Sequence, residues 1–379
     1  MSQPDNFGFS EEAALLKTSA RKFFEDKFPV SALHSLVAAD HDPARENQCL
    51  WDQKLWQEML ALGWHILAVP ESAGGVGMPV AAVAGLAEEL GRSGFPCPLL
   101  STISVCYVLN ACEGDTELAF SEVMEGHGAT LAITNKRGDW SAAETDCQVY
   151  DGKLCGTAWF VQDARKSERL LVSAQSEAGL CLYWVDVAAP GVALHADRIS
   201  DLTRDQARIE FDNVDATLVA RNGLTALNQA MPAIWTVFAA DMVGAAEWQL
   251  QTTVDYANTR QQFDHPLGFF QAVKHPLVDV MIEIDRAKSL VYNAACAIDY
   301  EPERADQFAH MAKAAASDAA AFASSRSVQL HGGIGFTWEC YVHLFFKRQK
   351  HSQRLFGDGA WHRARLADAV IGPVSLADP

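Results

Sequence analysis

The hydrophobic periodicity of the chain changes twice, and this change constrains the fold more than any other feature. From Ser10 to about residue 125, apolar residues recur at the spacing of amphipathic helices. From about 130 to 224 the period becomes two, as in "ERLLVSAQ" and "LCLYWVDV". Long helical patterns then return at about 225–260, 271–300 and 304–330. Few folds run from helices to strands and back to helices.

Turn and cap residues mark the ends of these elements. Ser10 precedes two glutamates and an apolar pattern, which is typical of a capped helix start. Gly63 ends a later helix, and the pair Asp151-Gly152 predicts a hairpin between two strands. We therefore predict an α+β fold with an N-terminal α-helical domain over 1–125, a middle antiparallel β domain over 126–224 and a C-terminal four-helix-type bundle over 225–379.

The charge of the chain limits its partners. Its 30 basic and 48 acidic residues give a net charge of −18, which argues against nucleic acid and anionic membranes as partners. The nine cysteines form no CxxC pair, which is typical of reduced thiols, and no metal site is expected. Neither a signal peptide nor a membrane-spanning run is evident, so we expect a cytoplasmic protein.

One tight turn between two long helices is unusually basic for so acidic a chain. The stretch "TRQQFDHPLGFFQAVKHP" carries Arg260, Lys274 and His275 around a turn that contains phenylalanine and glycine. An anionic ligand of this protein must be held by local basic groups or by backbone N–H groups. The turn is therefore a candidate anion-binding site.

Three segments at matching separations resemble one known family. They are "VPESAGGVGM" followed by "AGLAEELGR", the run "ANTRQQFDHPLGFFQAVKHPLVDVMIEID", and "VQLHGGIGFTWE". Together they resemble the acyl-CoA dehydrogenase family over essentially the whole chain, although Asp264 replaces a glycine of the family pattern. The family has the α–β–α domain order, binds FAD and removes hydrogens from Cα and Cβ of an acyl-CoA thioester.

The resemblance implies a set of residues that contact FAD. Arg260, Phe263 and Gln271 would lie against the FAD of a neighbouring subunit, with Arg260 as a bidentate donor to the pyrophosphate. Gln329, Gly332 and Gly333 would complete the site, because glycine lets backbone N–H groups approach phosphate closely. Alternatively, Arg260 and Lys274 cap helix ends and "HGG" is only a helix-terminating turn. His331 and His275 are interpreted as packed or capping residues.

The middle domain departs from the family pattern. Members carry "T-E-P-x-x-G-S-D", which meets the flavin ring and the thioester, but residues 133–146 read "ITNKRGDWSAAETD" and retain only Thr134. Trp159 stands where the family places an aromatic residue beside the flavin. It could equally be an ordinary aromatic residue of the sheet.

The usual positions of the catalytic base are empty. The family's "Y-E-G-T" segment matches "LFGDGAWHR", with Gly357 at the position of the glutamate, and the base of isovaleryl-type members matches Ile234. Asp358 is interpreted as a helix cap. Asp241 is the one charged residue between Arg221 and Glu247, and the steroid side-chain branch carries a glutamate there. Asp241 is therefore the candidate base, and a structural ion pair with an arginine of a neighbouring helix is the alternative.

These observations lead to two hypotheses about function. The first is an FAD-dependent acyl-CoA dehydrogenase subunit that introduces an α,β double bond into an acyl-CoA, with a bulky, steroid-derived acyl group as a candidate substrate. The resemblance implies an electron-transfer flavoprotein as electron acceptor and a tetramer with itself or a homologous subunit. The second is a non-catalytic structural subunit of a heteromeric acyl-CoA dehydrogenase.

Overall fold

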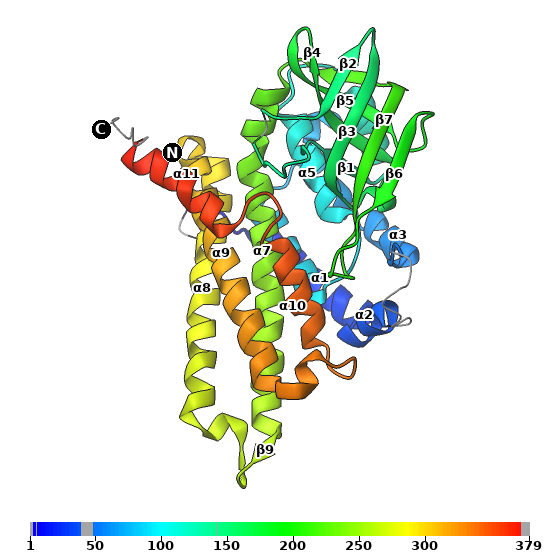
Figure 1. Ribbon diagram of the computed structural model, residues 1–379. Coiled ribbons are helices and arrows are strands. Elements are labelled where there is room, and N and C mark those ends of the chain that lie inside the picture. The colour runs from blue at the N-terminus through cyan, green and yellow to red at the C-terminus, as the bar shows by residue number, and fades with distance from the viewer. Residues whose placement is uncertain (1–2, 5, 39–47, 142, 373–379) are drawn as a thin grey trace, which may run out of the picture. The chain divides into compact units, whose positions relative to one another are not determined.

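The computed structural model describes residues 3–4, 6–38, 48–141 and 143–372 (Figure 1). The chain forms two compact units, which are described separately. Unit 1 combines Met1–Ala38, Pro79–Phe95 and Trp235–Pro379, and unit 2 combines Ala39–Met78 and Pro96–Ile234. The domain boundaries at 125 and 224 stay a prediction, because they follow the change from helix to strand and not this grouping.

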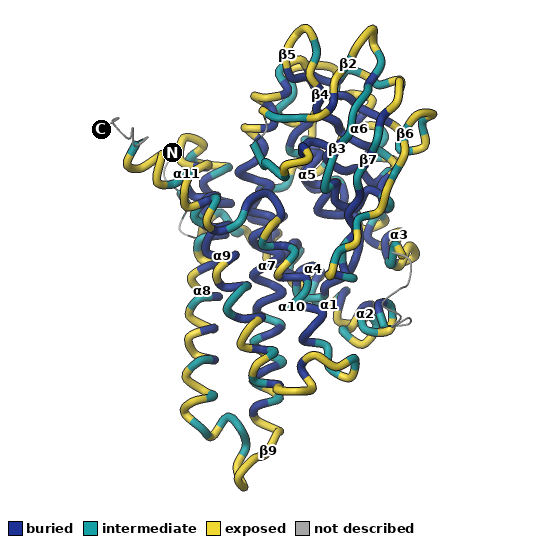
Figure 2. Tube along the Cα trace, viewed as in Figure 1, coloured by how far each residue is buried: buried dark blue, intermediate teal, exposed yellow. Residues whose placement is uncertain are grey.

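Unit 1 is helical, and its long helices are those that the periodicity predicts. Helices α8 and α9 have 30 residues each and pack along one another, each with an exposed outer side (Figure 2). Helix α7 has 37 residues and contributes to both units. The helices of unit 1 are α1 (Glu11–Lys27), α2 (Val30–Val37), α4 (Val80–Ser93), α7 (Gly223–Thr259), α8 (Gln271–Tyr300), α9 (Pro302–His331), α10 (Val342–Ser352) and α11 (Gly359–Ile371).

The predicted end signals are confirmed. The Ser10 side chain accepts a hydrogen bond from Ala13 N at the start of α1. Gly63 takes the left-handed conformation after helix α3 (Gln53–Ala61) in unit 2. Asp151 and Gly152 both have positive φ, as a two-residue hairpin turn requires.

Unit 2 packs short helices with an eight-stranded sheet. The strand order is β6-β7-β3-β2-β4-β5-β8, with β1 beside β4. Two strands of this sheet, β6 and β8, were not among the runs predicted from the sequence. The elements are α3, α5 (Leu99–Asn110), α6 (Glu117–Met124), β1 (Ala129–Ala132), β2 (Cys147–Tyr150), β3 (Lys153–Gln162), β4 (Arg169–Ser176), β5 (Gly179–Asp186), β6 (Val192–Ala196), β7 (Gln206–Asp215) and β8 (Thr217–Ala220).

The prediction of a purely antiparallel sheet is wrong for two strand pairs. β1 and β4 pair in parallel over all four residues of β1, and β2 meets β4 in parallel at Gln148 and Gln175. The β2–β3 hairpin separates β1 from β4 along the chain, so both strands enter the sheet in the same direction. A period of two does not report strand direction. All four residues of β1 are buried, which is typical of a parallel strand covered on both faces.

Two glycines bring helix α4 into backbone contact with α7 in unit 1. A Cβ at Gly91 would lie 1.9 Å from the carbonyl oxygen of Asp241, and a Cβ at Gly244 would lie 1.8 Å from that of Glu88. These separations are far below any real Cβ contact, so any other residue would push the helices apart. The pair of glycines therefore fixes where the carboxylates of Asp241 and Glu88 lie.

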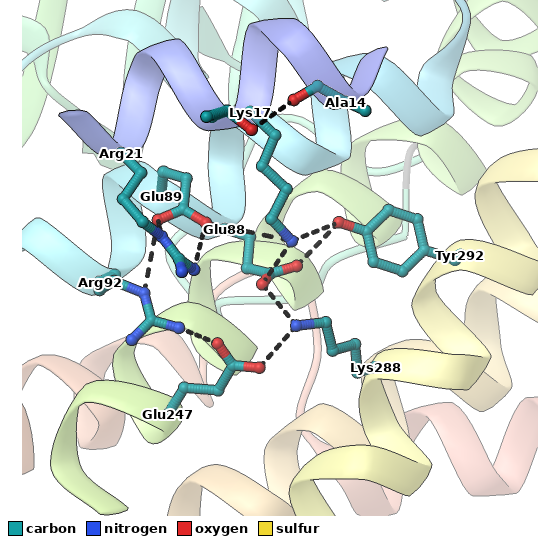
Figure 3. A network of polar contacts seen from close by, with 10 residues as sticks. Ala14, Lys17, Arg21, Glu88, Glu89, Arg92, Glu247, Lys288 and Tyr292 are labelled. Carbon is teal, nitrogen blue, oxygen red and sulfur yellow. Dashed lines mark hydrogen bonds and ion pairs between the residues drawn. The ribbon is translucent and has the colours of Figure 1, made fainter. Parts of the chain in front are cut away.

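A buried charge network surrounds the α4 side of this crossing (Figure 3). The Glu88 carboxylate accepts from Lys288 Nζ at 2.8 Å and from the Tyr292 hydroxyl at 2.8 Å, and it pairs with Lys17 at 2.6 Å. Burial alone would raise the pKa of Glu88, but Lys17 and Lys288 hold it below its ordinary value. The next residue, Glu89, accepts two hydrogen bonds from Arg21. The "EEL" segment thus ties α1 and α8 to α4.

We expect Gly244→Ala to destabilise the protein. The added methyl group collides with the Glu88 carbonyl, and overpacking of this kind costs about 1–3 kcal/mol. Thermal unfolding followed by circular dichroism would show a lowered Tm. Gly333→Ala, compared with wild type in flavin-free protein, is the matched control, because a Cβ there meets no described atom within 4 Å and its φ is not left-handed. An unchanged Tm for Gly244→Ala would contradict the contact.

Candidate functional site

The structure brings six of the predicted FAD residues to one end of the bundle in unit 1. Helix α7 ends there, α8 begins there and α9 ends there (Figure 1). All six residues are exposed to solvent. They are Arg260, Phe263, Gln271, Gln329, Gly332 and Gly333.

A short hairpin shapes the turn between α7 and α8. Strands β9 (Gln261–Gln262) and β10 (His265–Pro266) are joined by Phe263 and Asp264, both at positive φ. Aspartate tolerates this conformation better than most residues, which explains how Asp264 can stand where the family has glycine. The carbonyl oxygen of Arg260 accepts from Leu267 N at 2.8 Å and closes the turn.

Exposed apolar side chains surround this end of the bundle. Phe263 is 86% exposed, and Phe336 and Phe269 are 57% and 58% exposed. Monomeric proteins rarely leave so many large apolar side chains together in water. We call this surface the apolar tip: Phe263, Phe269, Val278, Met281, Ile282, Ile334 and Phe336.

The glycine pair after α9 has room for a ligand. Gly332 ends the helix with φ 64° and ψ −142°, and its N–H donates to Gln329 O. Gly333 has no left-handed φ, and a Cβ there would meet no described atom within 4 Å. Neither the backbone nor packing within the chain therefore requires glycine at 333. A group that approaches the backbone from outside, such as a phosphate, would require it, so this cradle fits the pyrophosphate of FAD.

His331, before the glycine pair, is a packed residue as predicted. Its ring stacks on Tyr256 at a centroid distance of 4.4 Å, and Nδ1 lies 2.8 Å from Ser327 O. Burial lowers its pKa. His275 is exposed.

In unit 2, the structure links Thr134 to Trp159. The backbone N–H of Trp159 donates to the carbonyl oxygen of Thr134 at 2.9 Å. This N–H is free to do so because β3 has a bulge between Ala158 and Val161, where it pairs with β7. Bulges redirect side chains and are frequent beside functional sites.

Polar groups of residues 133–146, the segment that departs from the family pattern, form hydrogen bonds with one another. Asn135 is buried, and its Oδ1 accepts from the N–H groups of Arg137 and Asp139 at 3.1 and 3.2 Å. The N–H of Lys136 donates to Asp146 Oδ2 at 2.7 Å. These backbone donors are occupied within the loop and are not directed at a ligand.

The position of the family's usual glutamate is closed. Gly357 has φ 97°, and a Cβ there would lie 2.6 Å from the Trp361 indole. Its carbonyl accepts from Lys313 Nζ at 3.0 Å, and the Lys313 side chain is fully buried. Asp358 caps α11 by accepting from Trp361 N at 2.9 Å, as predicted.

A pair of buried histidines holds the same loop. The Phe356 carbonyl can only accept, so His362 donates to it through Nε2 at 3.1 Å. His362 Nδ1 must then accept from His310 Nδ1–H at 2.7 Å. His310 stacks on Trp235 at 4.4 Å, next to Ile234. The Gly357 position is thus packed against Trp361 and His362.

Asp241 forms a buried ion pair. Arg348 of α10 donates to Asp241 Oδ1 at 2.5 Å, and both residues are almost completely buried. This is the arginine partner that the alternative interpretation requires. A carboxylate in so apolar a helix needs compensation of its charge, and Arg348 provides it.

Sequence comparisons agree with the fold. The profile described as "Acyl-CoA dehydrogenase, N-terminal domain" matches residues 10–112, and the profile described as "Acyl-CoA dehydrogenase, C-terminal domain" matches residues 221–371. The chain belongs to the acyl-CoA dehydrogenase family. It is also 31% identical to acyl-CoA dehydrogenase IpdE2 of Mycobacterium tuberculosis over 328 residues, 85% of this chain and 89% of that protein.

Solved structures of this oxidoreductase family share the architecture. A variant of the Tcur3481-Tcur3483 steroid ACAD matches with a TM-score of 0.83 and 29% identity, over 95% of this chain and 98% of the other. The ChsE4-ChsE5 complex from Mycobacterium tuberculosis matches with a TM-score of 0.84 and 24% identity, over 97% and 100%, and supports the fold. Within the described part of this acyl-CoA dehydrogenase, no helix has the length and hydropathy that a membrane crossing needs.

We expect stability to fall as pH drops below about 6.5. Burial lowers the pKa of His343 to about 4 and of His362 to about 2, so both stay neutral in the folded protein while the unfolded chain takes up their protons. The contribution of each histidine to the free energy of unfolding is complete above pH 6.5 and falls by about 1.4 kcal/mol per pH unit below it. For His343 this fall ends at about pH 4. Urea unfolding between pH 7 and 5 measures the slope. His343→Leu removes one proton-binding group, so the free energy of unfolding should change by about 1.4 kcal/mol less per pH unit. An unchanged slope would contradict this account.

Proposed function

We propose that this chain is an FAD-binding acyl-CoA dehydrogenase subunit that introduces an α,β double bond into an acyl-CoA thioester. The observation that carries the proposal is the group of exposed residues at the end of the bundle, beside the apolar tip. There Arg260 and the unconstrained Gly333 offer a site for a pyrophosphate. FAD, when bound, would accept the β hydrogen as hydride. The chain's own task is to hold the dinucleotide, exclude water and place a proton acceptor.

We also propose that the functional unit contains more than one chain. The cradle and the apolar tip are exposed on the free chain, so a neighbouring subunit would cover them and complete the FAD site. A tetramer, or a dimer of heterodimers with a homologous subunit, would do so. The 29% sequence identity to a variant of a steroid ACAD supports a bulky, steroid-derived acyl group as substrate, as does the closure of the usual base position at Gly357.

Two further parts of the proposal rest on family membership. An electron-transfer flavoprotein is proposed as the acceptor of electrons from the reduced cofactor. A cytoplasmic location is proposed as well, and the free cysteines support it.

Asp241 is the proposed proton acceptor on this chain. It is the one carboxylate on the buried part of α7, and Arg348 would hold it ionised and oriented. A carboxylate within an apolar site can remove the α proton once the thioester is polarised.

A second candidate function is favoured by the same ion pair. Asp241 is paired with Arg348, Ile234 is apolar and Gly357 is closed by Trp361. The chain would then contribute structure and half of an FAD site, and a homologous subunit would supply the base. The two candidates differ in what the loss of the Asp241 charge does.

Arg260→Ala should lower the flavin content of the purified protein without unfolding it. Loss of a charged, bidentate phosphate contact costs about 1.5–3 kcal/mol, a tenfold or greater loss of affinity. The ratio of absorbance at 450 nm to 280 nm measures flavin content in protein purified alone and with a homologous subunit. Arg286→Ala is the control, because it removes an exposed arginine of α8 that pairs with Glu283. Full flavin occupancy in Arg260→Ala would overturn the assignment.

Asp241→Asn should separate the two candidate functions. For a base on this chain, the folded and flavin-loaded variant loses proton removal by on the order of 10²–10⁴. Exchange of the acyl-CoA α hydrogen in D2O measures this step without an electron acceptor. In either case Arg348 is left uncompensated and about 3–5 kcal/mol of stability is lost, but for a purely structural ion pair the exchange rate per folded, flavin-loaded protein stays at the wild-type value. Asp358→Asn is the control, since that side chain only caps a helix and pairs with Arg354. Wild-type exchange in stable Asp241→Asn would remove Asp241 from the mechanism.

A further inference from the structure

The bulge in β3 places Trp159 against two cations. Ala158 pairs with Ile209 and Val161 pairs with Ala207, so Trp159 and Phe160 together face Arg208 on β7. The Arg208 guanidinium lies 5.3 Å from the centroid of the indole, and Lys136 Nζ lies 5.5 Å from it. We call these three residues the Trp159 platform: Trp159, Lys136 and Arg208.

Both charged members of the platform are cations. Glu210 Oε1 lies 3.0 Å from Arg208 and Oε2 lies 3.3 Å from His195 Nε2, so one carboxylate faces two basic side chains. In the adjacent loop, Glu144 is paired with Arg137 at 2.7 Å. Lys136 and Arg208 are thus the charged groups over the indole, while the adjacent loop also carries the carboxylates of Asp139 and Asp146.

Three backbone donors of the adjacent loop are already used within the loop. The N–H groups of Lys136, Arg137 and Asp139 all donate to side chains within the loop. An anionic group at Trp159 would therefore be held by the side-chain cations. Lys136 is exposed, so its long side chain can move from the face of the indole to the edge of a stacked ring, whereas Arg208 is half-buried.

We infer that Lys136 and Arg208 stabilise negative charge on a flat ring stacked on Trp159. The inference rests on the proposed function, in which that ring is the isoalloxazine of FAD. Hydride from the substrate's β carbon brings two electrons and one proton to the ring, while the α proton leaves to a base, so the reduced ring carries a negative charge. Two cations within 5.5 Å of the centroid of the indole on which it stacks favour this charged form by Coulomb attraction.

Sulfite tests the inference without turnover. Its lone pair forms a bond to flavin N5 and bleaches the visible band, and the adduct carries negative charge on the ring without any other reactant. We expect Lys136→Gln and Arg208→Gln each to raise the dissociation constant of the sulfite adduct by on the order of tenfold, and Lys136→Arg to restore it. Lys153→Gln is the matched control. It removes a cation from β3, the strand that carries Trp159, and this cation pairs with Asp215 on β7.

The possible outcomes separate the inference from the proposed function. Wild-type protein that binds no flavin, alone or with a homologous subunit, overturns both. Flavin-loaded wild type that forms no adduct, or variants with wild-type sulfite affinity, overturn the inference alone. A tenfold loss in Lys153→Gln also overturns it, because the effect would then be one of net charge. Should Arg208→Gln fail to fold, the exposed Lys136 carries the test.

Discussion

The backbone contact between α4 and α7 is the constraint on which the rest of unit 1 depends. Gly91 and Gly244 let the two helices touch at the carbonyl groups of Asp241 and Glu88. Because the contact leaves no space for side chains, the acids on either side of it must find partners elsewhere. Asp241 finds Arg348 on α10, and Glu88 finds Lys17, Lys288 and Tyr292. The contact thus determines which helices are joined by charge.

Much of the fold could be predicted from the sequence, because periodicity and cap residues are local. The boundaries of α8 and the left-handed pair Asp151-Gly152 were predicted in this way. The parallel pairing of β1 with β4 could not be, since an alternating pattern shows which face of a strand is buried and not which way the neighbouring strand runs.

The candidate site was predicted unevenly for a related reason. Arg260 and the Gly332-Gly333 pair could be proposed from the sequence because they lie in contiguous stretches that resemble the family. Partners distant in sequence were not found: Arg348 is 107 residues from Asp241, and Arg208 approaches Trp159 only because of a bulge. The isolated charge of Asp241 did signal that a cation had to be near, without saying which one.

The closure of position 357 has an evolutionary consequence. A chain cannot acquire a glutamate there by one substitution, because the new side chain would meet the rigid indole of Trp361 at 2.6 Å and the backbone has φ 97°. The indole would have to shrink first, and that change alone would open a void beside His362 and Trp235 with no gain in chemistry. The intermediate sequence is penalised in either order. Descendants of this chain are therefore more readily selected for new arrangements around Asp241 or for reliance on another subunit than for a return to the common base position.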